Sequence, residues 1–121
     1  MSTSDMELTE MLISDREPNI FVNETSVVLS SELVRQMNVK TGDKIQLMHD
    51  MKLGDYYLKK SDNGLPLKSF SHCKNRLALH SRNVSKILRN NAMKVKHICE
   101  KKEYNGEAVF LIFTRKNYYG K

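Results

Sequence analysis

The sequence has no tryptophan, only two cysteines, only two prolines and no long apolar run. Two cysteines cannot build the disulfide framework of a small secreted scaffold. Proline and glycine are too scarce for a collagen-like or low-complexity chain. Apolar runs such as residues 109–113 are far shorter than the roughly 20 residues of a bilayer-spanning helix. Because no basic and then apolar segment follows Met1, we also expect no secretory signal and a cytoplasmic location.

The rest of the composition is that of one globular domain. The 121 residues are 28% charged and 40% hydrophobic, which is typical of a chain that buries a core without a disulfide or metal. Seven methionines beside two cysteines fit a reducing compartment. We expect a tail over residues 1–18 and a single domain over residues 19–121, with halves at residues 19–68 and 69–121.

Charge is distributed unevenly along the chain. Residues 1–18 have five acidic residues and one arginine, a net charge of −4, and residues 19–68 have a net charge of +1. Residues 69–121 have twelve basic and three acidic residues, a net charge of +9. Positive charge concentrated in one half favours a polyanionic partner, and nucleic acid is first among these.

The spacing of potential ligands and nucleophiles gives little support to metal binding or catalysis. A four-ligand set can be written from His72, Cys73, His97 and Cys99. Structural zinc sites, however, space paired ligands as C-x₂₋₄-C or H-x₃₋₅-H, and neither spacing occurs here. The simpler interpretation is two small buried thiols and two ordinary histidines. Since no phosphate-binding loop, zinc-protease motif or nucleophile elbow occurs, we expect no catalytic residue, no metal and no cofactor.

A first block of the chain, from residue 19 to residue 64, predicts a strand, a helix and two further strands. Ser30 or Ser31 can cap the helix, and Asn38 can end it because asparagine tolerates the left-handed conformation. Asn63-Gly64 closes the block, and this pair readily supplies the positive φ of a tight turn. The strands are expected at residues 19–29, 44–48 and 56–58, and the helix at residues 32–37.

A second block follows the same plan. Leu77-Ala78-Leu79 is a short apolar run, and Ser81 can cap a helix over residues 82–91. The expected inward face of this helix carries Val84, Ile87 and Leu88. Strands are expected at residues 93–98 and 108–113, joined by a turn at Asn105-Gly106.

The two blocks superpose when the sequence is shifted by fifty residues. Identical residues then meet at Leu29/Leu79, Ser31/Ser81, Val34/Val84, Lys44/Lys94 and Lys52/Lys102. Cap, helix face and strand coincide together, while the last strands are offset by about two residues. We interpret the domain as two βαββ-like halves, a degenerate internal repeat with a possible pseudo-two-fold axis.

Residues 27–47 combine a strand, a short helix and a Gly-Asp turn into a further strand. The residues that carry this pattern without a gap are Glu32, Leu33, Met37, Val39, Gly42, Asp43 and Ile45. Over residues 25–60 the chain resembles the AbrB/MazE-like swapped-hairpin family of DNA-binding domains. Asn38 stands where that family usually has glycine, and Ser30-Ser31 stand where it has proline and a basic residue. The resemblance implies a dimer in which each chain supplies half of a barrel, whereas an internal repeat would let one chain supply both halves.

Basic residues of the second half form the candidate nucleic-acid-binding site. Arg82, Lys86 and Arg89 fall at i, i+4 and i+7 of the expected helix and therefore on one stripe. Such a stripe could neutralise phosphates, although any amphipathic helix also needs a charged solvent face. Two further basic residues precede the helix, and two follow it on one face of the next strand. The candidate residues are Lys74, Arg76, Arg82, Lys86, Arg89, Lys94 and Lys96.

The sequence therefore predicts a small α+β, β-rich domain of swapped-hairpin or barrel-like architecture. Its expected function is that of a DNA-binding transcriptional regulator that contacts duplex DNA through the basic half. A non-enzymatic domain that binds an acidic protein partner is the main alternative, and a divergent enzyme is a weaker one. The choice between DNA and RNA and the existence of a homodimer stay open, and no membrane contact is expected.

Overall fold

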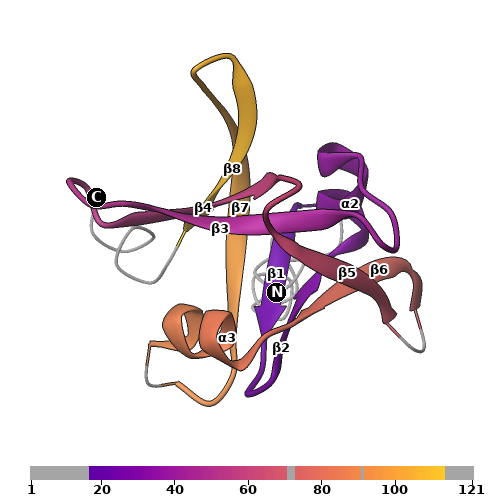
Figure 1. The fold of residues 1–121 in the computed structure, drawn as a ribbon. Helices are drawn as coiled ribbons and strands as arrows, with labels where there is room; N and C mark the ends of the chain where they lie inside the picture. The colour runs from indigo at the N-terminus through magenta and orange to yellow at the C-terminus, as the bar shows by residue number, and fades with distance from the viewer. Residues whose placement is uncertain (1–16, 71–72, 91, 114–121) are drawn as a thin grey trace, which may run out of the picture.

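The computed structural model describes residues 17–70, 73–90 and 92–113, without the side chains of Cys73 and Lys74. These residues form eight antiparallel strands and two short helices (Figure 1). The elements are β1 (Asn19–Val22), β2 (Ser26–Leu29), α2 (Ser31–Met37), β3 (Lys44–Asp50), β4 (Asp55–Lys60), β5 (Leu65–Phe70), β6 (Cys73–His80), α3 (Arg82–Arg89), β7 (Val95–Tyr104) and β8 (Glu107–Phe113). The acidic segment predicted as a tail lies outside the described residues, apart from Glu17 and Pro18.

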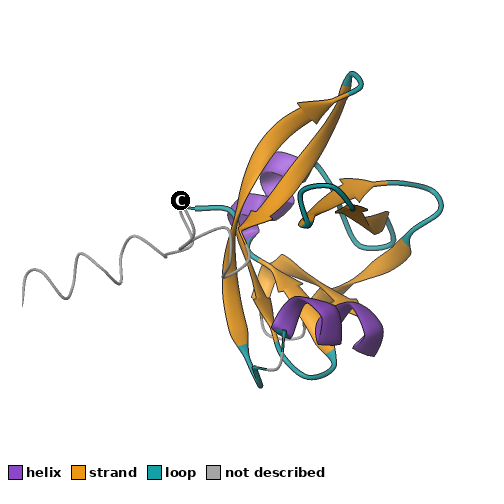
Figure 2. Ribbon diagram, turned by 90° about the vertical axis from the view of Figure 1, so that its left-hand side faces the viewer, coloured by secondary structure: helices purple, strands orange, loops and turns teal. Residues whose placement is uncertain are grey.

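The strands close into one barrel in the order β1-β2-β6-β5-β3-β4-β8-β7, and β7 returns to β1. The predicted β-rich, barrel-like fold is confirmed, and a single chain closes the barrel. The two helices lie on opposite sides of the barrel (Figures 1 and 2). Each helix follows one strand of the antiparallel pair β2–β6, β2 for α2 and β6 for α3.

Buried side chains from all eight strands fill the barrel, and most of them are aliphatic. Val27 and Leu29 of β2 are fully buried, and β6 sets Leu77 and Leu79 opposite them. Both helices contribute to the same core cluster, α2 through Leu33 and Met37 and α3 through Leu88. Helices of seven or eight residues are not stable on their own. The burial of these apolar side chains therefore stabilises α2 and α3 against the barrel.

Two hairpins extend beyond the barrel, as Figure 1 shows for β3–β4 and β7–β8. The β7–β8 turn is made by Asn105 and Gly106, with φ of 53° and 81°, as the Asn-Gly pair predicts. The β3–β4 turn runs through Met51 and ends at Gly54, whose φ is 77°. Asp50 shapes this turn, since its side chain accepts the backbone N–H of Lys52 at 3.0 Å.

The segment 19–29, predicted as one strand, is two strands with a turn between them. The side-chain carbonyl of Asn23 accepts the backbone N–H of Thr25 at 2.9 Å and of Ser26 at 2.8 Å. An asparagine that bonds the chain two and three residues on reverses its direction. β1 and β2 therefore pair with each other, with Phe21 opposite Val28.

β5 is not expected from the sequence, and the positive φ expected at Asn63-Gly64 is not found. Neither Asn63 nor Gly64 has positive φ among the residues that the structure describes. A Cβ on Gly64 would lie 2.0 Å from the carbonyl oxygen of Ile45, so close approach to β3 is what requires glycine here. The chain then continues directly into β5, where Leu65 pairs with Ile45.

Candidate nucleic-acid interface

α3 carries three of the seven candidate cations and is defined by its caps. The Ser81 hydroxyl accepts the backbone N–H of Val84 at 3.2 Å, which satisfies one of the free donors of the first turn. Asn90 ends the helix in the left-handed conformation with φ of 49°. The predicted serine cap is confirmed, and the helix ends at Arg89 rather than at residue 91.

α3 is rotated relative to the predicted inward face. Ile87 is 46% exposed, whereas Ser85 is fully buried and Leu88 is 2% exposed, so the inward assignment of Ile87 is wrong. The Ser85 hydroxyl donates to the backbone carbonyl of Asn23. A carbonyl of the β1–β2 turn thus meets a polar residue on the helix, and a periodicity based on apolar residues alone could not find this contact.

Arg82 and Lys86 lie on the exposed side of α3, one helical turn apart. Neither forms an ion pair with a carboxylate among the described residues. The first turn of the helix also contains no acidic residue. Their positive charge is therefore free to attract an external anion.

Arg89 has a different position from the other two members of the stripe. Its Nη1 donates to the carbonyl oxygen of Ala92 at 2.8 Å, and its Nε is buried without a hydrogen-bond partner. The side chain is half-buried and closes the turn between α3 and β7. We infer that Arg89 stabilises the end of α3, and that its guanidinium is less accessible to a ligand than the side chains of Arg82 and Lys86.

Lys94 and Lys96 lie where β7 starts, next to the end of α3. His97 joins the two elements, because its Nε2 lies 2.9 Å from the carbonyl oxygen of Leu88 and its Nδ1 lies 3.1 Å from that of Phe113. His97 is buried, while Lys94 and Lys96 are exposed and have no carboxylate partner among the described residues. These two lysines add exposed positive charge shortly after the end of α3 in the chain.

Lys74 and Arg76 lie toward the opposite end of β6 from α3. His80, the last residue of β6, is six positions after Lys74, which is about 20 Å along an extended strand. Arg76 is half-buried and takes part in an interaction, and the side chain of Lys74 lies outside the described part of the structure. The seven candidate residues are thus split: five lie on α3 or shortly after it in the chain, and two lie toward the far end of β6.

We call Arg82, Lys86, Lys94 and Lys96 the α3 surface.

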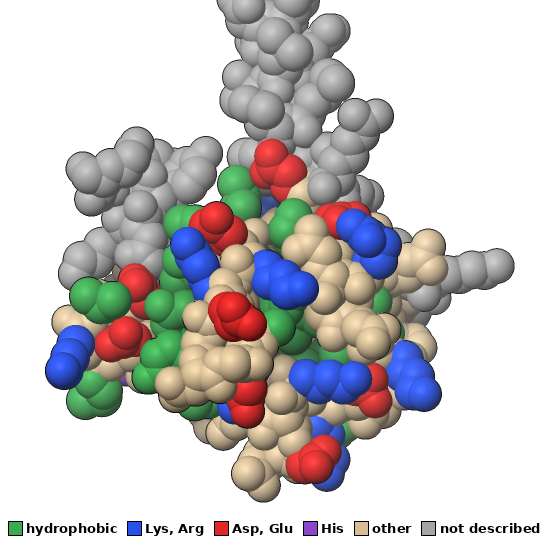
Figure 3. Space-filling view, turned by 90° about the horizontal axis from the view of Figure 1, so that it is seen from above, with side chains coloured by type: hydrophobic (Ala, Val, Ile, Leu, Met, Phe, Trp, Pro, Cys, Tyr) green, Lys and Arg blue, Asp and Glu red, His purple; other side chains and the backbone are tan. Residues whose placement is uncertain are grey.

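On the face that carries the β7–β8 hairpin, by contrast, cations and carboxylates alternate (Figure 3). Pairs in the described structure include Lys59–Glu107 at 2.7 Å and Lys102–Glu100 at 3.6 Å. Exposed pairs of this kind neutralise one another locally and contribute little to stability.

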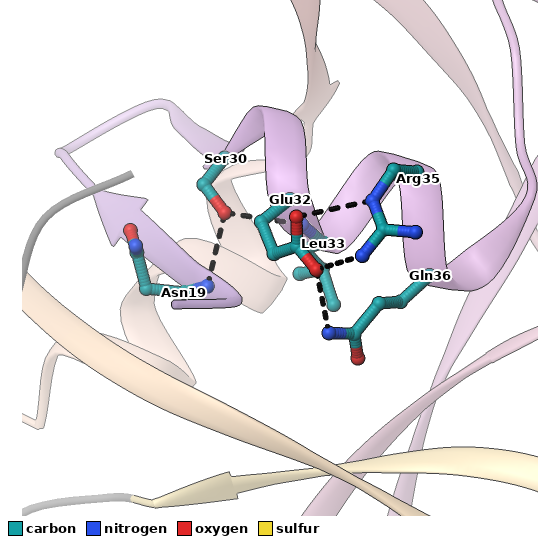
Figure 4. Close-up of polar contacts among 6 residues, drawn as sticks. All are labelled: Asn19, Ser30, Glu32, Leu33, Arg35 and Gln36. Atoms are coloured by element: carbon teal, nitrogen blue, oxygen red, sulfur yellow. Dashed lines mark hydrogen bonds and ion pairs between the residues drawn. The ribbon is translucent and has the colours of Figure 1, made fainter. Parts of the chain in front are cut away.

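α2 has no comparable surface, because its charges are paired with each other (Figure 4). The Glu32 carboxylate accepts Nε of Arg35 at 3.1 Å, a second bond from Nη2 of the same guanidinium, and Nε2 of Gln36 at 2.9 Å. Hydrogen bonds from Arg35 and Gln36 lower the pKa of Glu32 below its ordinary value, and the bond to Glu32 raises the pKa of Arg35. An open groove of about 490 Å³ beside this pair is lined by both charges and by Asn75 of β6.

The residues considered as zinc ligands do not form a site in the part of the chain that is described. Among those residues no group of three or more histidine, cysteine or acidic side chains is placed to hold a metal. Both ring nitrogens of His97 already face backbone carbonyls. Burial raises the pKa of the Cys99 thiol to about 12, which disfavours the thiolate that metals bind. His72 and the side chain of Cys73 lie outside the description.

Comparisons with protein-family models, with curated proteins and with solved structures find no match for this chain. Within the described ranges, no helix is long and apolar enough to cross a bilayer. Assignment of a function therefore depends on the geometry and charge of the molecule itself.

Proposed function

We propose that this chain binds duplex DNA as a regulator, with the α3 surface contacting phosphates. The observation that carries the proposal is the exposure of Arg82, Lys86, Lys94 and Lys96 without carboxylate partners among the described residues. Cations that neutralise phosphates release the counterions condensed on DNA, and this release supplies sequence-independent affinity. The net charge of +9 over residues 69–121 would add long-range attraction.

The proposal includes an internal duplication related to the AbrB/MazE-like pattern. The order of strands around the barrel is unchanged when β1–β4 are exchanged with β5–β8. β2 and β6 pair antiparallel with Val28 opposite Ala78, and these residues are fifty positions apart, the shift that superposes the two sequence blocks. Both features support two related halves, of which the second carries the binding surface.

A domain that binds an acidic protein is the second candidate. Ile87 favours it, because an isoleucine that is 46% exposed stands beside Lys86 on the exposed side of α3. An exposed isoleucine does not contribute to phosphate contacts, which are made by charged and polar groups. Protein interfaces, by contrast, combine an apolar centre with a polar and charged rim.

The deciding experiment is a titration of the full chain with random duplex DNA at 50 mM and 200 mM salt. With four phosphate contacts we expect a slope of log K against log salt of about −3.6, hence an affinity loss of about 10²-fold. Random RNA duplex and an acidic polypeptide of similar length are measured in parallel. No association with DNA at low salt overturns the proposal, and tight binding of the polypeptide alone favours the second candidate.

A further inference from the structure

The β3–β4 hairpin has an open edge beyond the barrel. β4 pairs with β3 from Ile45 to Asp50, but β5 pairs with β3 only at Lys44 and Ile45. Gly64 lies against the backbone at Ile45 and Gln46, so the open edge starts at Leu47. Backbone groups that point away from β4 over residues 47–49 have no strand partner among the described residues, and such an edge can accept an added strand.

Exposed apolar side chains surround this edge. Met48 is 38% exposed, Met51 is 85% exposed and Leu53 is 66% exposed. Leu65 pairs with Ile45, where β5 begins to pair with β3, and it is 44% exposed. Half of the large hydrophobic residues exposed in the described structure thus belong to this one region, which indicates an interaction surface.

The corresponding edge of β7 is protected from pairing. β1 pairs with β7 only from Val95 to Ile98, so the β7–β8 hairpin also extends past its neighbour. Here Glu100, Lys101, Lys102 and Glu103 are all charged. Antiparallel self-pairing at the centre of this run would set Glu100 against the partner's Glu103, and like charges directly opposite are destabilising. Charged edges are a common protection against association, and residues 46–49 of β3 contain no Lys, Glu, Asp or Arg.

We propose that the open edge of β3 pairs with the same edge of a second copy of this chain, with Met48 on the two-fold axis. Antiparallel pairing then sets Met48 against the partner's Met48 and Leu47 against the partner's His49. Over residues 46–50 no like charges oppose each other in this register, because Gln46 stands against the partner's Asp50.

The same register explains the exposed leucine of β5. Pairing centred on residue 48 brings the partner's Met51 level with Ile45, where β5 ends the open edge and Leu65 is exposed. The apolar hairpin tip of one copy would therefore cover Leu65 of the other, and the symmetry would repeat the contact. An isologous arrangement of this kind closes after two copies.

The test is the oligomeric state of the full chain without nucleic acid, measured by sedimentation velocity. We expect a mass of twice 14.0 kDa at high concentration. Met48→Lys places two cations on the axis and should weaken dimerisation at least about tenfold. Lys102→Glu at the edge of β7 is the matched control and should leave the dimer intact. A monomeric wild-type chain, or a dimer that Met48→Lys does not weaken, overturns the proposal.

A cross-linking experiment tests the register in a background with Cys73→Ser. Met48→Cys places two sulfurs across the axis, within the Cα separation of 4.4–6.8 Å that a disulfide needs. Rapid formation of a covalent dimer by Met48→Cys, but not by Lys102→Cys, supports the pairing, and the reverse result overturns it. Because no DNA is present, these outcomes are independent of the proposed function.

Discussion

α2 and α3 each begin after a serine whose hydroxyl accepts a backbone N–H three residues on, and each ends at an asparagine with positive φ. Each inserts a buried leucine into the core, Leu33 from α2 and Leu88 from α3. Their surfaces differ, because the carboxylate of α2 neutralises its own arginine, whereas the first turn of α3 has no acidic residue.

The comparison separates the packing of a helix from its charge. Both helices satisfy the same requirements for capping and burial, so neither feature explains why one is cationic. The charge of α3 is carried by side chains on its exposed side, where packing leaves the choice of residue free. The proposed contact of α3 with a polyanion would account for the difference.

The largest expected effect tests whether the helices are equal in packing. Leu33→Ala and Leu88→Ala each remove a fully or almost fully buried side chain and should each lower the free energy of unfolding by about 2–5 kcal/mol. Urea denaturation of both variants measures this. A loss below about 1 kcal/mol for Leu88→Ala alone would mean that α3 is only loosely docked.

The difference in charge between α2 and α3 should appear as a difference in their contribution to DNA binding. Arg82→Glu with Lys86→Glu should reduce affinity for duplex DNA by about 10²-fold and make the salt slope shallower by about 2. The matched variant, Arg35→Glu with Lys40→Glu beside α2, changes the net charge by the same amount and should reduce affinity less than about fivefold. Fluorescence anisotropy measures both, with thermal melts as the control for folding. Equal losses would show that net charge rather than the α3 surface governs binding.

The two serine caps should differ in their contribution to stability. Ser30 is buried, and its hydroxyl accepts both Leu33 N–H at 3.2 Å and Asn19 N–H at 3.0 Å. Ser81 is half-buried, and its hydroxyl accepts only one backbone N–H in the described structure. We expect Ser30→Ala to cost about 1–3 kcal/mol and Ser81→Ala to cost about 1 kcal/mol. Chemical denaturation measures the loss of unfolding free energy in both variants. A larger loss for Ser81→Ala than for Ser30→Ala would contradict the expected difference between the two caps.

The smallest effect is the titration of Glu32. Bonds from Arg35 and Gln36 favour its carboxylate, so its pKa is lower in the folded state than in the unfolded state. The stability that this pair contributes is therefore present above the unfolded pKa and is lost as pH falls through the folded value. An NMR titration of the side-chain carboxyl should show the lowered midpoint, and Arg35→Ala should bring it back toward the ordinary value. An unchanged midpoint in Arg35→Ala would exclude Arg35 as the cause.

Local signals in the sequence predicted the helices and the β7–β8 turn well. The serine caps, the left-handed Asn38 and Asn105-Gly106 act through their own backbone, so they can be recognised without knowing the rest of the fold. β5 escaped recognition because Pro66 and Lys68 interrupt its apolar pattern, and the strand exists because β3 and β6 pair with it on both sides. The break between β1 and β2 depends on the side chain of Asn23, which composition alone does not reveal.

The candidate site was predicted in part. The positions of Arg82 and Lys86 on one stripe follow from helical geometry, and the structure leaves both exposed. Arg89 belongs to the same stripe, but its guanidinium is occupied by the Ala92 carbonyl. Separation of Lys74 and Arg76 from α3 could not be foreseen, because it depends on the length and direction of β6 within the barrel.

The sequence by itself determined the serine caps of both helices, the Asn105-Gly106 turn and the excess of positive charge in the second half, since each depends on residues close together in the chain. The tertiary structure alone decided which cations lie together, which are paired with carboxylates and which strand edges stay open. These properties depend on contacts between residues that are far apart in sequence, and only closure of the barrel brings those residues together.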